Sequence, residues 1–248
     1  MAALLMPTFF PKRKSLMELA KIEKALREVG LLSRGGFHPH IDDNVPPLPD
    51  GRPAKTVVLA GNVGDSVWHS FQAAVQKGGG TLSLDQWTRQ VLTAVARKVK
   101  AHALFPFSGP PYLPFQRWAQ HAEPVAPSPI GPLIHPEYGL WHAYRGALAF
   151  AEHLELPPPV ARATPCQSCT TRPCLSTCPV GALTSDHFNM LACLEHLGSE
   201  AGAECLHGGC LARRACPVGV EFQYPRPQAR FHQQAFLRNA MKTVTRHS

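Results

Sequence analysis

The sequence predicts an α+β domain followed by a smaller cysteine-rich module. All eight cysteines of the 248-residue chain lie between residues 166 and 216, and residues 1–165 contain none. The first part instead combines stretches with helical and with strand periodicity. The proline run 157–159, which continues neither a helix nor a central strand, marks the boundary. We therefore expect domains over 1–156 and 166–248, joined near 156–165.

Amphipathic helices and short apolar strands account for the first part. Two capping-box spacings, each a serine followed three residues later by an acid or an amide, precede apolar residues with a helical period. The helices expected from them cover 16–29 and 83–99, and a shorter one covers 67–75. The strands are expected at 56–60, 102–107 and 145–150. Helices packed on a modest sheet follow from this order.

The first cysteine run has the spacing of an iron–sulfur protein. Cys166-x2-Cys169-x4-Cys174-x3-Cys178-Pro179 is close to the bacterial ferredoxin run C-x2-C-x2-C-x3-C-P, with two additional residues before the third cysteine. Three thiolates in one tight loop can bind three corners of a cubane, while the cysteine before proline binds a second cluster. This run predicts [4Fe–4S] clusters.

The second run repeats the first in degenerate form. Cys193 stands alone, and the run that follows ends in Cys216-Pro217-Val218-Gly219, as the first ends in Cys-Pro-Val-Gly. If each cysteine before a proline binds the other run's cluster, every cysteine is used once. The ligands expected for one cluster are Cys166, Cys169, Cys174 and Cys216, and those for the other are Cys178, Cys193, Cys205 and Cys210.

Zinc and disulfide bonds are the alternatives for eight cysteines. Zinc ribbons use two C-x2-C pairs separated by a long spacer, which this spacing lacks. A disulfide framework needs an oxidising compartment. Export is not expected, because the basic residues 12–14 follow the apolar stretch 1–10 instead of preceding it. The sequence contains no uninterrupted run of about 18 apolar residues, the length needed to span a bilayer. We therefore expect a soluble, cytoplasmic protein with no membrane partner.

The formal charge of +8 would favour a polyanionic partner. Two clusters, each carrying about −2 with its four thiolates, would lower that charge to about +4. A dedicated nucleic-acid binder is therefore disfavoured. The basic C-terminal stretch 225–247 is expected to form a helix over the domain junction, with contact to RNA or to an acidic electron donor as the alternative.

The segment 129–146 alternates small, aromatic and basic residues with no amphipathic period. It resembles the cobalamin-processing protein of the CblC type, in which a similar His-Pro-x-aromatic-Gly-x-Trp…Arg-Gly stretch leads into an apolar strand. The resemblance is carried by His135, Pro136, Tyr138, Gly139, Trp141, Arg145 and Gly146.

This resemblance implies a cobalamin, or a flavin in its place, in the N-terminal domain. The cofactor-binding residues it implies are His135, Tyr138, Trp141, Arg145 and Gly146. His135 and Tyr138 are also the candidate catalytic residues, as proton donors. A turn histidine before proline and a surface ion pair are the alternatives for His135 and Arg145.

The cysteine region resembles epoxyqueuosine reductase, which also has four cysteines ending in Cys-Pro, an isolated fifth, and three more ending in Cys-Pro. That family and the reductive dehalogenases join a nitroreductase-like, cobalamin-binding α/β-layered domain to a ferredoxin-like module with two [4Fe–4S] clusters. The resemblance implies an oxidoreductase that passes electrons from an external donor, such as a ferredoxin or flavodoxin, to a small-molecule or cobalamin substrate. The alternative is a pure electron carrier whose N-terminal domain docks a protein and holds no second cofactor.

Overall fold

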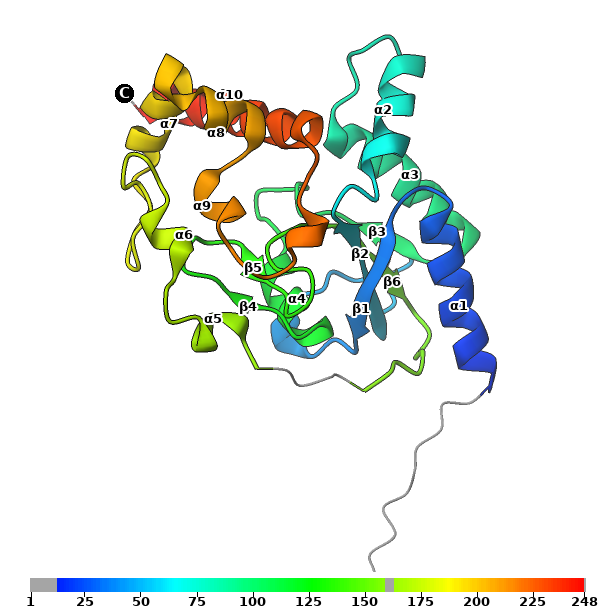
Figure 1. Cartoon of the computed structure of the whole chain (residues 1–248). Coiled ribbons are helices and arrows are strands. Elements are labelled where there is room, and N and C mark those ends of the chain that lie inside the picture. The colour runs from blue at the N-terminus through cyan, green and yellow to red at the C-terminus, as the bar shows by residue number, and fades with distance from the viewer. Residues whose placement is uncertain (1–12, 159–162, 248) are drawn as a thin grey trace, which may run out of the picture.

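A four-stranded antiparallel sheet lies at the centre of the structure, a computed structural model that describes residues 13–158 and 163–247 (Figure 1). Its strands follow the order β1-β2-β6-β3. Their bounds are β1 Leu32–Phe37, β2 Thr56–Val63, β6 His142–Phe150 and β3 His102–Leu104. A separate ribbon pairs β4 (Ala126–Pro127) with β5 (Leu133–Ile134). With its small antiparallel sheet and many helices, the chain has the predicted α+β fold.

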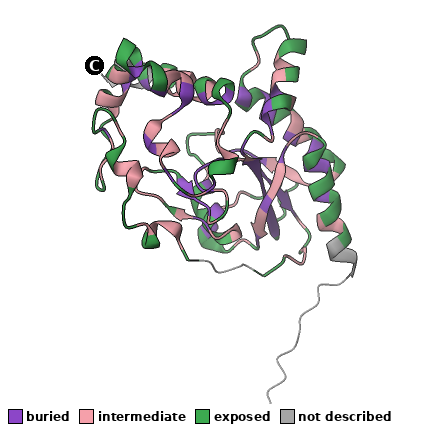
Figure 2. Cartoon of the chain, viewed as in Figure 1, coloured by how far each residue is buried: buried purple, intermediate pink, exposed green. Residues whose placement is uncertain are grey.

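Both faces of the sheet are covered, so its two central strands are apolar without alternation. Val58 and Leu148 face a core shared with α1 (Arg13–Arg27), α2 (Trp68–Lys77) and α3 (Leu84–Lys98). Leu59 and Ala147 face a second core, closed by α4 (Phe115–Ala122). Figure 2 shows the buried interior of the sheet between these layers. Burial on both sides explains the continuous apolar run that predicted β2.

Local sequence signals predict the helices that cover the first face of the sheet, α1, α2 and α3. Ser83 caps α3, because the Gln86 N–H donates to Ser83 Oγ at 3.1 Å and the Ser83 N–H donates to Gln86 Oε1 at 2.9 Å. Ser15 is the serine of the other predicted capping box. Helix α1 begins at Arg13, so Ser15 lies within the helix instead of preceding it. The apolar stretch 1–10, on which the expectation of no export signal depends, lies outside the described residues. Within the described ranges, no helix combines the length and the hydropathy that crossing a bilayer requires.

Two elements of the first part carry no local signal. Strand β1 contains Gly35 and Gly36, which weaken any strand pattern, and its register with β2 shifts between Ser33 and Gly36. Helix α4 follows Pro114 in a segment rich in prolines and aromatics. Trp118 in this helix is fully buried, and its Nε1–H donates to the Asp43 carbonyl oxygen at 2.8 Å. The aromatic residues of α4 therefore pack the second core.

The predicted strands differ from the observed ones at their ends. Strand β2 continues beyond 60 to Val63, and β3 ends at Leu104 instead of 107. Strand β6 begins at His142, three residues earlier than predicted. Its pairing with β2 passes from Tyr144 to Gly146, so Arg145 has no cross-strand partner. Such a bulge places one additional residue in a strand and redirects the side chains around it.

The cysteine-rich region consists of short helices and turns, closed by one long helix. The short helices are α5 Pro165–Ser168, α6 Pro173–Ser176, α7 Met190–Gly198, α8 Ala203–Gly208 and α9 Leu211–Arg214. Helix α10 (Arg226–His247) lies along α7 and α8 (Figure 1). Its fully buried Gln228 donates Nε2–H to the Gly64 carbonyl oxygen at 3.3 Å, and Gln233 donates to the Cys205 carbonyl oxygen at 3.2 Å. The helix thus contacts both parts of the chain.

Two glycines meet where the cysteine-rich region packs against the loop before β6. Gly139 has φ +56° and Gly219 has φ +70°. A Cβ at Gly139 would overlap the carbonyl oxygen of Val218, and one at Gly219 would overlap the carbonyl group of Tyr138. Only bare backbone can approach this closely, so the two glycines set the distance between the two segments.

We expect Gly139→Ala to lower the free energy of unfolding by about 1–3 kcal/mol more than Gly51→Ala, measured by urea unfolding. Gly51 also has positive φ, +83°, but a Cβ there would meet nothing within 4 Å. The control therefore carries the backbone strain without the overlap. Equal losses in the two variants would contradict a close approach at Gly139.

Candidate metal centres and the polar network beside them

Four cysteines line the first of two cavities in the cysteine-rich region. The first cavity has a volume of about 330 Å³, and its cysteines are Cys166, Cys169, Cys174 and Cys216. Three of them come from the segment of α5 and α6, and the fourth follows α9. Exposed polar residues, among them Thr170, Thr171 and Arg172, form part of the lining. This cavity is therefore partly polar at its rim.

The other four cysteines line the second cavity, which has a volume of about 230 Å³. They are Cys178, Cys193, Cys205 and Cys210. Cys193 lies on α7 and Cys205 on α8, while Cys210 is the N-cap residue of α9. Most of the remaining wall is apolar, including Leu183, Phe188 and Phe236. The two cavities divide the eight cysteines into the same two sets of four that the spacing predicts.

The thiols within each set lie close enough to oppose one another's ionisation. Burial, followed by the thiols of Cys210, Cys178 and Cys205, raises the pKa of Cys193 to about 11. Burial, followed by the thiols of Cys216, Cys174 and Cys169, raises the pKa of Cys166. Several thiolates packed together in this way require a cation among them.

The four cysteines of each set line one cavity, so the kind of metal group that fits the cavity can be asked. Within the described residues, no three Cys, His, Asp or Glu side chains converge in a way that would hold a single metal ion. A cubane of four irons and four sulfides presents its iron corners to four separate thiolates. The Ala182 N–H also donates to Cys178 Sγ at 3.3 Å, a contact that suits a thiolate. The donor set and its arrangement fit a [4Fe–4S] cluster in each cavity.

One loop of the first part contributes to both cavities. Pro129 and Ile134 line the first cavity, and Ile130 and Pro132 line the second. We call residues 129–134 the shared wall. Ile134 also packs with Leu140 and Cys216 in a small buried cluster. The cavities are therefore built from both parts of the chain.

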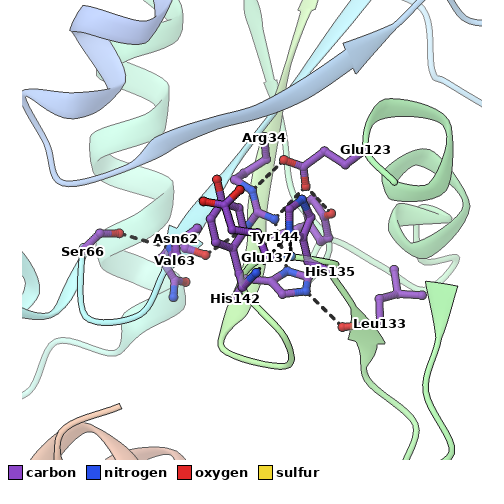
Figure 3. Close-up of polar contacts among 11 residues, drawn as sticks. Arg34, Asn62, Val63, Ser66, Glu123, Leu133, His135, Glu137, His142 and Tyr144 are labelled. Atoms are coloured by element: carbon purple, nitrogen blue, oxygen red, sulfur yellow. Dashed lines mark hydrogen bonds and ion pairs between the residues drawn. The ribbon is translucent and has the colours of Figure 1, made fainter. Parts of the chain in front are cut away.

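A buried ion pair lies beside the shared wall (Figure 3). Arg34 on β1 is 1% exposed, and its Nε–H and Nη2–H donate to the two carboxylate oxygens of Glu123 at 2.9 and 2.7 Å. The hydroxyl of Tyr144 on β6 donates to the same carboxylate at 2.6 Å. Burial, followed by the charge of Glu123, raises the pKa of Tyr144. The tyrosine therefore stays a donor.

His142 connects this ion pair to the shared wall. Its Nε2 lies 3.0 Å from the Leu133 carbonyl oxygen, which can only accept, so Nε2 carries the proton. Its Nδ1 then accepts from Arg34 Nη2 at 3.3 Å. Burial, followed by the positive charge of Arg34, lowers the pKa of His142 to about 3. A neutral imidazole thus holds the backbone of the shared wall against the sheet.

The depressed pKa of His142 predicts a loss of stability in mild acid. The unfolded state takes up a proton near its ordinary pKa of 6.5, whereas the folded state does not until about 3, so stability falls as the pH falls below 6.5. The loss from this residue is about 1.4 kcal/mol between about pH 7.5 and about pH 5.5. His142→Gln should remove that share in urea unfolding. The control is His69→Gln, at a side chain 84% exposed, which should leave the pH dependence of stability as in the wild type. If His142→Gln also left that pH dependence unchanged, the loss could not be assigned to His142.

The structure brings His135 and Tyr138 together. Their rings stack with centroids 4.2 Å apart, and the N–H groups of Glu137 and Tyr138 donate to His135 Nδ1 at 3.1 and 3.2 Å. His135 is 6% exposed. The histidine thus organises its own turn.

The other three residues of the predicted cofactor pocket pack elsewhere. The ring of Trp141 lies 4.5 Å from the guanidinium of Arg213. Arg145 pairs with Asp85 at 3.8 Å, and a Cβ at Gly146 would overlap Leu92 of α3. None of the five residues predicted to bind the cofactor lines either cysteine cavity. None lines the third cavity either, which has a volume of about 580 Å³ and lies beside β3 and α3.

Five residues at or beside these cavities were not predicted from the sequence. They are Arg34, Glu123, His142, His196 and Arg213. His196 alone has a local signal, since it follows Cys193 by three residues in a helix and so shares its face. Arg34 and Glu123 are 89 residues apart, and only the fold brings them into contact.

No protein-family model matches the chain, and no curated protein matches it either. Among solved structures, the B12-trafficking protein CblC of C. elegans has 15% sequence identity and a TM-score of 0.49, over 88% of this chain and 92% of that one. A selenomethionine-labelled epoxyqueuosine reductase has 16% identity and a TM-score of 0.47, over 87% and 69%. An epoxyqueuosine reductase solved with a tRNA-Tyr stem loop has 16% identity and a TM-score of 0.46, over 85% and 67%. These three similarities are distant in sequence, at 15–16% identity.

Proposed function

We propose that the chain is an iron–sulfur redox protein that binds one [4Fe–4S] cluster in each cavity. A single observation carries the proposal: the eight cysteines form two sets of four, each set lines one cavity, and every cysteine is used once. The proposed ligands are Cys166, Cys169, Cys174 and Cys216 in the first cavity and Cys178, Cys193, Cys205 and Cys210 in the second. Each cluster supplies a one-electron couple at the potential that its surroundings set.

The chain places the two sites close together and shields them. Cys174 and Cys178 line different cavities, and four residues of chain span at most about 14 Å. Apolar side chains of the shared wall line part of each cavity, Pro129 and Ile134 in the first and Ile130 and Pro132 in the second. Proximity and a low dielectric suit electron transfer between the sites.

The acceptor of the electrons distinguishes two candidate functions. The first is a reductase that passes them to a cobalamin, or a flavin, and a substrate in the N-terminal part. In this structure the residues expected to bind that cofactor pack against the protein itself: His135 stacks on Tyr138, Trp141 contacts Arg213 and Gly146 abuts Leu92. This packing favours the second candidate, a carrier that delivers electrons to another protein.

Iron analysis tests the two clusters. Protein purified without oxygen should contain about eight irons and eight acid-labile sulfides per chain and absorb broadly near about 400 nm. Dithionite should bleach this absorption as the clusters are reduced. Two zinc ions per chain, with no iron or sulfide, would overturn the proposal in favour of structural zinc.

Ligand titration distinguishes the reductase from the carrier. The iron-loaded protein is titrated with hydroxocobalamin and separately with FMN, under anaerobic conditions, and binding is followed by absorption and by fluorescence. Tight binding that weakens in Tyr138→Ala supports the reductase. Absence of binding to either compound, in protein with its full iron content, supports the carrier.

A further inference from the structure

Two buried nitrogen atoms without a hydrogen-bond partner belong to residues that line the second cavity. They are His196 Nε2 and Arg213 Nε, and neither has a partner within the described residues. A buried donor left unpaired costs about 1–3 kcal/mol, so its presence at a cavity indicates a missing acceptor. Both residues line the cavity together with the four thiols of Cys178, Cys193, Cys205 and Cys210.

Helix α7 fixes the position of His196. Cys193 and His196 lie three residues apart on this helix and both line the second cavity. The helix ends two residues after the histidine, at Gly198, and the hydroxyl and N–H of the C-cap residue Ser199 both donate to the His196 carbonyl oxygen, at 2.8 and 3.0 Å. Leu194 and Leu197 on either side are buried. The capped helix end thus fixes the backbone of His196, a residue that lines the cavity.

Arg213 is held by residues from both parts of the chain. Its guanidinium lies 4.5 Å from the ring of Trp141 and 4.7 Å from the ring of Tyr224, and its Nη2–H donates to the Leu140 carbonyl oxygen. These contacts engage Nη2 and the face of the guanidinium. They leave Nε–H as a fixed, buried donor on a residue of the cavity wall.

The first cavity has no corresponding pair. None of the buried unpaired nitrogen and oxygen atoms found in the described residues belongs to a residue that lines it. Its charged residue, Arg172, is exposed and therefore screened by water. Backbone donors occur in both sites, with Ala182 N–H on Cys178 in the second and Val218 N–H on Cys216 in the first. The side-chain donors are what distinguishes the two sites.

We propose that His196 and Arg213 hydrogen-bond the sulfur atoms of the cluster in the second cavity and raise its reduction potential above that of the first. The inference rests on the proposed function. Adding one electron to a [4Fe–4S]²⁺ core makes its sulfurs more negative, so donors to them stabilise the reduced form. Nε2 of His196 carries the proton in this contact, since cluster sulfurs only accept. Electrons delivered by an external reductant therefore collect in the second cavity.

Potentiometric titration followed by EPR tests this assignment. His196→Leu should retain about eight irons, with one of the two reduction steps moved to a more negative potential and the other unmoved. His196→Gln keeps an amide donor and should recover part of the shift. His207→Leu is the matched control, because His207 also has a buried unpaired nitrogen but does not line either cavity. It should leave both steps unchanged.

A second measurement uses the wild-type protein and does not depend on the stability of a variant. Protein labelled with ¹⁵N-histidine is reduced, and pulsed EPR should show a coupling between a reduced cluster and a histidine nitrogen. The coupling should be absent in His196→Gln and present in His207→Leu. Full iron content with no such coupling, or with both potentials unchanged in His196→Leu, would overturn the inference and leave the proposed function intact. Absence of iron–sulfur clusters would instead overturn the proposed function.

Discussion

Replacing Cys174 and Cys216 together with alanine should leave about four irons per chain, whereas replacing Cys174 and Cys178 together should leave almost none. The first pair belongs to one cavity, so the second cluster keeps all its ligands. The second pair belongs to different cavities, and each cluster loses a thiolate. Iron and sulfide analysis after anaerobic reconstitution measures the difference.

The two double variants are matched, since each removes two thiols and shares the Cys174 change. Sequential ligation, in which Cys166, Cys169, Cys174 and Cys178 bind the same cluster, predicts the opposite result. Under that arrangement the Cys174 and Cys178 variant would retain about four irons and the Cys174 and Cys216 variant would lose both clusters. That result would contradict the exchange of cysteines between the two runs.

Glu123→Ala should lower the free energy of unfolding by about 3–5 kcal/mol, because it leaves the guanidinium of Arg34 buried without its carboxylate. The side chains of Arg34 and Glu123 are 2% and 13% exposed. The variant also removes the acceptor of the Tyr144 hydroxyl. Urea unfolding of the iron-loaded protein, followed by circular dichroism, measures the loss.

Two further variants separate the ion pair from its neighbours. Tyr144→Phe removes one hydrogen bond and should lower the free energy of unfolding by about 1 kcal/mol. Glu28→Ala removes a carboxylate from an exposed pair with Lys98 and should be indistinguishable from the wild type. A loss in Glu123→Ala as small as that in Glu28→Ala would show that the buried pair does not support the fold.

The sequence predicted the elements whose signals are local. Helix α3 carries a complete capping box at Ser83, and β2 carries a continuous apolar run because both its faces are covered. Strand β1 and helix α4 were not predicted, since glycines and prolines obscure the period of segments that only long-range pairing and burial stabilise. The repeated Cys-Pro ending led to the proposed ligand sets, and the cysteines of each set line one cavity.

The surroundings of the predicted cofactor residues could not be read from sequence. His135 and Tyr138 lie three residues apart and carry a recognisable motif, yet a motif does not reveal whether its side chains face a cavity. Their burial depends on Arg34, which stacks over the Tyr138 ring at 5.3 Å, and on Phe222, whose ring lies 5.2 Å from it. These partners come from β1 and from the turn after the last cysteine, both distant in sequence.

The shared wall also constrains how the protein matures. Residues 129–134 precede every cysteine in the chain, yet they complete both cysteine cavities. In a nascent chain the two cysteine cavities are therefore incomplete until the first part of the chain has folded. If the cavities bind clusters as proposed, cluster insertion would be the closing step of folding, and its free energy would also stabilise the docking of the two parts. Iron limitation in the cell should consequently leave a folded sheet with a cysteine-rich segment open to proteases.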